Sequence, residues 1–391
     1  MLRLLAISKN TFIETLRQPI YAVIIIFSLL LMLLAPAVSM YTLDEDIMLL
    51  RELGLSTLFL AGLFIAVFAS TGAITEEIES GTITTVLSKP INRPTFVLGK
   101  FLGVSMAVAL AHLLVTMAFL MIIRHGVLET ASDEIDWTVI TAAGSAILAT
   151  LIITAFLNFV YDWNFPSTGI VLGTIFIGFG ILFLVFIDRD WHFNPAENHF
   201  EMFDIIASGL LLLALFALVA LAILFSTRFN EVLTLSFCVG VFLLGLISDW
   251  VFGRFADQKI SNPINIIIIA LPIIFSIFIW ILYIWFYFRN IRNSLPRFFF
   301  TTLGNLIRIF CFWAIPISFF TISNLFLRHY IKVPLLFYKD FHIFVSKIGS
   351  ILTPNLQIFW VSDAIYESGT IPASYLLLAI TYSGLYTAGI L

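Results

Sequence analysis

Charged residues, cysteines and the sequence patterns of catalytic sites are all scarce in this chain. Charged side chains make up 11% of the 391 residues, and the formal net charge is −4. A nucleic-acid-binding protein needs a concentrated basic surface, so this balance excludes that class. The two cysteines, Cys238 and Cys311, both fall within long apolar runs. They cannot cross-link external loops, and we interpret them as small core residues.

Motifs for nucleotide, metal or serine chemistry are also missing. A P-loop requires G-x-x-x-x-G-K-[ST], but Gly99-Lys100 is preceded by Pro94 where the first glycine should stand and followed by Phe101 instead of a hydroxyl residue. The patterns H-E-x-x-H and G-x-S-x-G do not occur. No stretch can house a soluble domain of about 100 residues. We therefore predict that the chain is not an enzyme and carries no cofactor or metal.

Apolar residues are abundant instead. They make up 61% of the chain and recur in runs of roughly 20 residues, the length that crosses about 30 Å of hydrocarbon. Lipid cannot satisfy bare backbone groups, and these runs lack strand-like alternation, so the spans should be helices. The predicted fold class is an all-α, polytopic membrane protein of ten helices, 20–41, 55–75, 101–123, 139–160, 168–187, 205–226, 232–250, 264–288, 303–325 and 374–391.

The basic residues predict the orientation of the chain. No cleavable signal is evident, since the leader is charged and the first apolar run is longer than a signal core. With the amino terminus in the cytoplasm, ten basic residues fall inside and nine outside, four of the nine in the segment 326–373. Long segments count little in the positive-inside rule, which leaves ten against five. We predict a cytoplasmic amino terminus.

Residues 1–19 form a distinct leader ahead of the first span. Apolar residues fall on one side of a helix and polar residues on another, Lys9 interrupts the apolar side, and Pro19 marks a turn into the bilayer. The apolar set is Leu2, Leu5, Ala6, Phe12, Ile13 and Leu16. We interpret this leader as an interfacial elbow helix on the cytoplasmic side; the alternative is a merely polar leader.

The segment Glu76 to Lys100, EEIESGTITTVLSKPINRPTFVLGK, is dense in charge and turn formers between two apolar runs. Gly81 and Thr82 open a short helix, and Pro90 forces Lys89 out of helical geometry. Ile83, Val86 and Leu87 share one face of about two turns. Acidic residues stand on one side of this helix, and Lys89, Arg93 and Lys100 on the other. It is either a plug for a socket on a soluble partner or a loop resting on lipid headgroups.

The same segment resembles a known family. E-x-x-x-G-T, L-S-K-P-x-x-R and the Gly-Lys that opens the next span, with TFIETLRQP before the first span, are similar to the ABC-2 type permeases, the membrane subunits of ATP-binding-cassette transporters. The resemblance covers about residues 1–125, and the segments 225–250 and 353–375 are similar to parts of bacterial members. The common family core has six spans, so the resemblance implies that the pair within 264–325 is an insertion.

Several expectations follow from the resemblance. The corresponding family segment is a coupling helix that docks in a groove of the ATPase, so contact with that ATPase would fall on Glu79, Gly81, Thr82, Ile83, Val86, Leu87, Lys89, Pro90 and Arg93. ATP and Mg would be bound by the partner, in two copies. A second permease copy or a similar subunit would complete the assembly in a bacterial cytoplasmic membrane. Export is implied more often than import.

Few polar residues lie within the predicted spans. His112 would be hydrogen bonded to a neighbouring helix or relay a proton, Asn158 lies near an inner end, and Arg308 would reach the cytoplasmic interface. Spaced glycines predict close helix packing within the subunit, or else between subunits; these are Gly99, Gly103, Gly169, Gly173, Gly178, Gly180, Gly240 and Gly245.

The external loop Asp188 to Asp204 is rich in acidic residues and contains His192 and His199. It is either a weak cation site or a solvated acidic surface. The basic, aromatic stretch Arg328 to Lys347 is either an interfacial helix outside the membrane or a sign of a miscounted span. The last run, 374–391, has no polar flank, so we expect a truncated chain or a helix that barely crosses.

The predicted organisation has four parts: the elbow, 1–19; the ABC-2-like transmembrane region, 20–250, with its coupling segment 76–100; an inserted helical pair with an external interfacial segment, 251–352; and an external loop with the last helix, 353–391. The predicted function is a transporter permease powered by a separate ATPase. A non-transporting anchor or mechanotransmission subunit of an ATPase complex is the alternative. An intramembrane enzyme is disfavoured by the missing catalytic groups.

Overall fold

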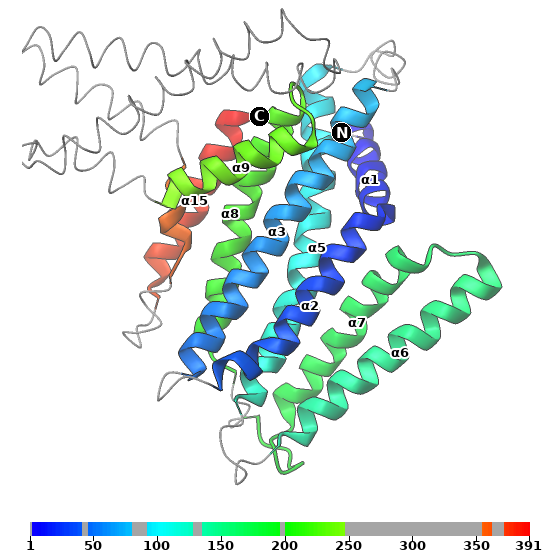
Figure 1. The fold of residues 1–391 in the computed structure, drawn as a ribbon, viewed down its shortest axis with the longest axis vertical. Coiled ribbons are helices and arrows are strands. Elements are labelled where there is room, and N and C mark those ends of the chain that lie inside the picture. The colour runs from blue at the N-terminus through cyan, green and yellow to red at the C-terminus, as the bar shows by residue number, and fades with distance from the viewer. Residues whose placement is uncertain are drawn as a thin grey trace, which may run out of the picture. The chain divides into compact units, whose positions relative to one another are not determined.

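A computed structural model describes residues 2–40, 46–79, 92–127, 135–195, 200–246, 354–361 and 371–391. Within these ranges the chain is helical, apart from one isolated antiparallel bridge between Ile187 and Phe193. The helices belong to one compact unit built from residues 1–245 and 356–391. The predicted all-α class is confirmed for the described part of the chain (Figure 1).

The helices follow one another with short connections. Their bounds are α1 Leu2–Arg17, α2 Pro19–Ser39, α3 Asp46–Glu79, α5 Arg93–His125, α6 Trp137–Tyr161, α7 Phe165–Phe186, α8 Met202–Ser226, α9 Glu231–Leu246, the 3₁₀ turn η3 Leu356–Phe359 and α15 Ala373–Ile390.

Seven of these helices are long and apolar enough to cross a membrane: α2, α3, α5, α6, α7, α8 and α15. Each overlaps a span predicted from the sequence. The predicted span 232–250 begins with α9, of which 16 residues are described. The predicted spans 264–288 and 303–325, and the basic stretch Arg328 to Lys347, lie outside the described residues, so the total of ten spans stays a prediction.

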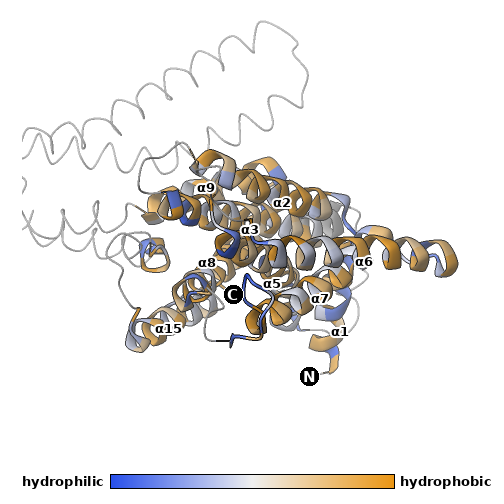
Figure 2. Cartoon of the chain, turned by 90° about the horizontal axis from the view of Figure 1, so that it is seen from below, coloured by the Kyte–Doolittle hydropathy of each residue, from blue (hydrophilic) through white to orange (hydrophobic). Residues whose placement is uncertain are grey.

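Helix α3 packs against α2, α5 and α8, and these contacts form the centre of the bundle. Outer helices keep large apolar side chains exposed, among them Phe27 and Leu33 on α2, and Ile152 and Phe156 on α6. Hydrophobic colour accordingly covers the outward faces of α2 and α6 in Figure 2. Such a surface is stable where it meets hydrocarbon rather than water.

Local sequence signals explain several helix ends. Pro19 and Pro94 occupy the first or second positions of α2 and α5, where a missing N–H costs nothing. The Asp136 carboxylate caps α6 by accepting hydrogen bonds from the N–H groups of Thr138 and Val139. Gly126, with φ 76°, ends α5 in a conformation that glycine adopts without strain. The spans are therefore delimited by residues that can be recognised in the sequence.

Most of the predicted glycine contacts lie within the subunit. Gly99 and Gly103 of α5 face α1, Gly173 of α7 faces Leu114 of α5, and Gly180 faces Met121. Gly169 and Gly178 are also in ordinary contact with a neighbouring helix, whereas no atom lies near a Cβ placed on Gly240. The expectation of packing inside the subunit is confirmed for the glycines of α5 and α7.

Candidate functional site

The described chain frames the predicted coupling segment from both sides. Glu79 is the last residue of α3, and Arg93, which is exposed, is the first residue of α5. Figure 1 shows these two helix ends at the same end of the bundle as α1. The remaining predicted contact residues, Gly81, Thr82, Ile83, Val86, Leu87, Lys89 and Pro90, lie outside the described residues, so their role stays a prediction.

Helix α1 packs closely on the first turns of α5. A Cβ on Gly99 would lie 2.7 Å from a methyl carbon of Ile7, and one on Gly103 would lie 2.6 Å from the carbonyl oxygen of Ser8. Real Cβ atoms essentially never approach this closely, so both positions require glycine. The glycine pair therefore forms a seat for α1 at the base of the coupling segment.

The end of α1 is also held by α3. The side chain of Gln18, between α1 and α2, occupies the space over Gly72 of α3 that a Cβ would fill. Gly72 lies two helical turns before Glu79. The elbow region thus contacts both helices that lead into the coupling segment.

Lys100 departs from the sequence-based expectation. We predicted it on the charged rim of the coupling segment, but it is 2% exposed and its ammonium group lies 5.7 Å from the centre of the Phe96 ring. Phe96 is one turn earlier on α5. Burial results from the close seat of α1, because Lys100 follows Gly99 directly. Lys100 is therefore a buried residue of the α1–α5 region rather than a rim charge.

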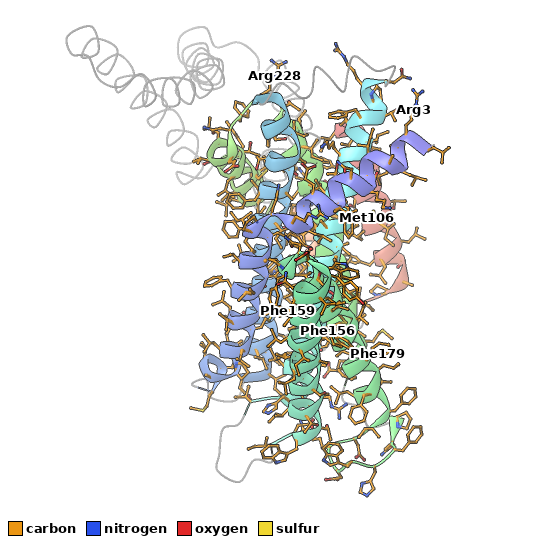
Figure 3. All side chains as sticks on the ribbon, turned by 90° about the vertical axis from the view of Figure 1, so that its right-hand side faces the viewer. Arg3, Met106, Phe156, Phe159, Phe179 and Arg228 are labelled. Carbon is orange, nitrogen blue, oxygen red and sulfur yellow. The ribbon has the colours of Figure 1, made fainter. Side chains whose placement is uncertain are left out.

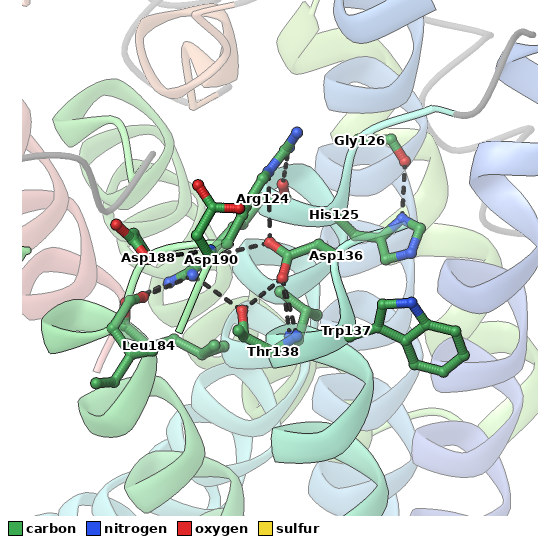
Figure 4. Close-up of polar contacts among 12 residues, drawn as sticks. Arg124, His125, Gly126, Asp136, Trp137, Thr138, Leu184, Asp188 and Asp190 are labelled. Atoms are coloured by element: carbon green, nitrogen blue, oxygen red, sulfur yellow. Dashed lines mark hydrogen bonds and ion pairs between the residues drawn. The ribbon is translucent and has the colours of Figure 1, made fainter. Parts of the chain in front are cut away.

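At the opposite ends of α5, α6 and α7, Arg124 is the centre of a buried polar cluster (Figure 4). Its guanidinium group donates to the carboxylate of Asp136 at 3.4 Å, to the hydroxyl of Thr138 at 3.1 Å and to the carbonyl of Ile187 at 2.7 Å. It also donates to the carbonyl of Leu184. We call Arg124, Asp136, Thr138 and these two carbonyls the Arg124 junction.

Arg189 joins this cluster from the loop after α7. Its Nε lies 3.5 Å from the Asp136 carboxylate, and its Nη2 donates to the carbonyl of Arg124 at 2.9 Å. The side chains of Arg124 and Asp136 are fully buried, whereas that of Arg189 is 43% exposed. The junction binds three helices and one loop through a single carboxylate and a single buried guanidinium.

The pKa of Asp136 reflects this environment. Burial by itself raises the pKa of the carboxyl group, but the hydrogen bonds from Thr138 and Val139 and the charge of Arg124 outweigh it. The net effect holds the pKa of Asp136 below its usual value of 3.8. Asp136 is therefore ionised at neutral pH, as the pairing with Arg124 requires.

A second ion pair connects α3 with α8 at the same end of the bundle. Arg51 Nε lies 3.0 Å from Asp204, whose side chain is fully buried, and Arg51 also pairs with Glu201. The sequence led us to treat Asp204 as part of either a cation site or a solvated acidic surface. That interpretation was wrong for Asp204, because it is buried against Arg51.

The other acidic residues of this loop differ. Asp188 Oδ1 accepts hydrogen bonds from the N–H groups of Asp190 and His192, and the His192 ring nitrogen lies 3.9 Å from Asp188. Across the described ranges, no group of three His, Cys, Asp or Glu side chains has the arrangement of a metal site. Glu197 and His199 lie outside these ranges.

Polar residues within the membrane spans make local contacts. The His112 Nε2 atom lies 2.9 Å from the carbonyl oxygen of Ser208 on α8, which confirms the predicted hydrogen bond to a neighbouring helix. Asn158 donates to the carbonyl of Trp163 and so closes the turn between α6 and α7. Arg308 lies outside the described part of the chain.

Sequence reasoning missed both external ion pairs because it treated Arg51, Arg124 and Asp136 only as loop charges. One signal was available: Asp136 stands directly before an apolar run, where an aspartate caps a helix. Its ionic partner was not readable, since Arg124 reaches it only through the fold.

Seven apolar spanning helices, packed through glycines and joined by buried ion pairs at one end, define the class as a polytopic helical membrane protein. Comparison with protein families gives the second step. Residues 5–162 match the ABC-2 family transporter protein family, so this part of the chain, with the whole predicted coupling segment, belongs to the ABC-2 transporter permeases. Neither curated proteins nor solved structures gave a match.

Proposed function

We propose that this chain is the membrane-spanning subunit of an ABC exporter, driven by a separate ATPase that docks on the helix 82–88. The observation that carries the proposal is the ABC-2 family match over residues 5–162, which includes every residue predicted to contact the ATPase. ATP and Mg would be held by the ATPase, in two copies. A second copy of this chain or a similar subunit would complete the transport path in a bacterial cytoplasmic membrane.

The packing around α1 supports a mechanical role for the coupling segment. Gly99 and Gly103 join α1 to α5, and Gly72 joins Gln18 to α3, so the two helices that carry the segment share one clamp. The 34 residues of α3 form a rod about 51 Å long. In the proposed mechanism, closure of the ATPase pushes the segment, and α1, α3 and α5 tilt together. The clamp converts a local push into movement of spans.

The proposal is tested by purifying the tagged chain from its native membrane and measuring how much ATPase accompanies it. Leu87→Asp should remove an apolar contact, and Gly81→Pro should distort the start of the helix, so each variant should lose the ATPase while remaining inserted. Ile135→Asp makes the same apolar-to-acidic change at an exposed position beyond the other end of α5, and it should retain the ATPase. Undiminished ATPase on Leu87→Asp would refute docking at this segment.

A second measurement separates transport from anchoring. Vesicles that contain the purified complex should show ATP-dependent movement of a substrate if the chain is a permease. If ATPase binds but ATP drives no flux of any candidate cargo, the chain acts as an anchor or mechanotransmission subunit. Direction of flux relative to the ATPase side then distinguishes export from import.

A further inference from the structure

Helix α1 has three sides, and only one of them faces protein closely. Ser8, Thr11 and Thr15 are buried, and Ser8 and Thr11 lie over Gly103 of α5. Hydroxyl and small side chains allow this close approach. The apolar side predicted from the sequence is therefore not the side that seats α1 on the bundle.

The apolar side begins in the protein core and ends uncovered. Leu16 is buried in the main hydrophobic cluster, and Phe12, one turn earlier, packs against that cluster. Further toward the amino terminus, Leu5 and Leu2 continue the same side with 60% and 85% of their surface exposed. Because Phe12 and Leu16 contact residues of the spanning helices, the same side leads outward from membrane depth. Leu2 and Leu5 therefore point to a lipid environment.

Basic residues accompany this uncovered apolar side. Lys9 is exposed within it, and Arg17 is exposed where α1 ends. The third side carries Asn10 and Glu14, both exposed, together with Arg3. Figure 3 shows Arg3 at the outer end of α1, away from the helices on which α1 packs. Three basic residues against one acidic residue give this helix a positive surface.

We propose that the outward surface of α1 binds anionic phospholipids. Leu2 and Leu5 contact the outer ends of the acyl chains, and Lys9 and Arg17 pair with the phosphate groups. Each basic residue near a negatively charged membrane surface favours binding by about fivefold, an attraction that a zwitterionic surface lacks. A long cationic side chain in an apolar side fits this site, since its stem stays among chains while its charge reaches the phosphate.

This inference rests on one part of the proposed function, the placement of α1 at a membrane surface, and it requires no ATPase. It also adds a consequence. Because α1 is clamped to α3 and α5 beside the coupling segment, anionic lipid bound to α1 holds the cytoplasmic ends of these helices in place. The lipid composition of the membrane then affects the same helices that the ATPase is proposed to move.

The test uses the full chain in lipid nanodiscs, with Cys238→Ala and Cys311→Ala and a bimane fluorophore on Leu5→Cys. Brominated phosphatidylglycerol, as a minor component of phosphatidylcholine, should quench the fluorophore more strongly than the same fraction of brominated phosphatidylcholine. A fluorophore on Leu30→Cys, an exposed position of α2, serves as the matched control and should be quenched equally by both lipids. High salt should reduce the preference at Leu5, because it screens exposed charges.

Two charge variants complete the design. Lys9→Gln should lower the preference for phosphatidylglycerol by about fivefold, and adding Arg17→Gln should remove it. Arg189→Gln neutralises a half-exposed arginine in the loop after α7 and should leave the preference unchanged. Equal quenching by both lipids at Leu5 in the unmodified chain would overturn the proposal, as would a preference that survives loss of both Lys9 and Arg17. The fluorescence readout does not depend on ATPase binding, so failure here leaves the proposed function to its own test.

Discussion

At the residue scale, the largest single dependence is on Arg124. Its guanidinium is fully buried and donates to four acceptors from α6, α7 and the loops beside them. Removing one member of a buried ion pair leaves the other charge without compensation, which costs about 3–5 kcal/mol. Arg124→Met should therefore lower the free energy of unfolding by this amount, measured by denaturant titration in mixed micelles.

Two further variants separate the ion pair from ordinary packing. Arg124→Met combined with Asp136→Leu removes both charges, so the double variant should recover much of the lost stability. Arg189→Gln, at a half-exposed position, should cost about 1 kcal/mol or less. A double variant less stable than Arg124→Met alone would contradict the view that the unpaired Asp136 causes the loss.

The pH dependence of the Arg124 junction follows from the lowered pKa of Asp136. A carboxyl group whose pKa is lower in the folded protein contributes stability above its unfolded pKa and loses it as the pH falls through the folded value. The unfolded value is 3.8, so the stability difference between the native chain and Asp136→Asn should be constant at neutral and mildly acidic pH. It should shrink only below pH 3.8. Stability curves of both proteins across pH check this; a difference that already declines near neutral pH would be inconsistent with the lowered pKa.

At the element scale, the seat of α1 on α5 depends on two glycines. A Cβ on Gly103 would meet the backbone oxygen of Ser8 and the side chain of Thr11, and a backbone atom cannot move aside cheaply. Gly103→Ala should therefore cost about 1–3 kcal/mol by overpacking and loosen α1. Hydrogen exchange of the α1 amides should rise relative to the amides of α8.

The control is Gly144→Ala in the interior of α6. No atom lies within 4 Å of a Cβ placed there, so the same substitution meets free space. Alanine also has the higher helix propensity, by about 0.5–1 kcal/mol. Gly144→Ala should leave exchange in α1 unchanged and stability equal or higher. If both variants loosen α1 equally, the close packing of Gly103 is not what holds the helix.

The elements also show where sequence reasoning succeeds and where it stops. Runs of apolar residues predicted the seven long helices, because the hydrocarbon thickness sets span length and the signal lies in consecutive residues. The same reasoning placed the apolar side of α1 correctly but could not find its packing side, Ser8, Thr11 and Thr15, because hydroxyl residues carry no strong hydrophobic period. The partner of Asp204 was likewise out of reach, since Arg51 lies 153 residues earlier in the chain.

At the scale of the whole molecule, the ion pairs bear on orientation. Of the five basic residues that the predicted topology leaves outside in short segments, Arg51, Arg124 and Arg189 pair with buried carboxylates at one end of the bundle. They therefore have a structural reason to occupy that end. At the other end, Lys9, Arg93 and Arg228 are exposed. Exposed cations near the ends of spans are the ones expected on the cytoplasmic side.

Helix α7 offers a direct test of this orientation. Its 22 residues extend about 33 Å, which is enough to cross a bilayer once. Trp163 and Phe193 flank the helix and are both exposed, so a cysteine at either position can react with a maleimide. In a background with Cys238→Ala and Cys311→Ala, a membrane-impermeant maleimide added to intact cells should label Phe193→Cys and spare Trp163→Cys until the membrane is opened.

Each other outcome has a distinct meaning because the two positions belong to one helix. Labelling of Trp163→Cys alone would reverse the orientation and place the coupling segment outside the cell, where no ATPase could reach it. Labelling of both positions from outside would mean that α7 does not cross the membrane. The expected pattern puts the turn between α6 and α7, the ends of α3 and α5 and the α8–α9 turn on the cytoplasmic side. It also leaves both external ion pairs beyond the reach of the ATPase, so the force it applies must travel the length of α3 and α5 to affect them.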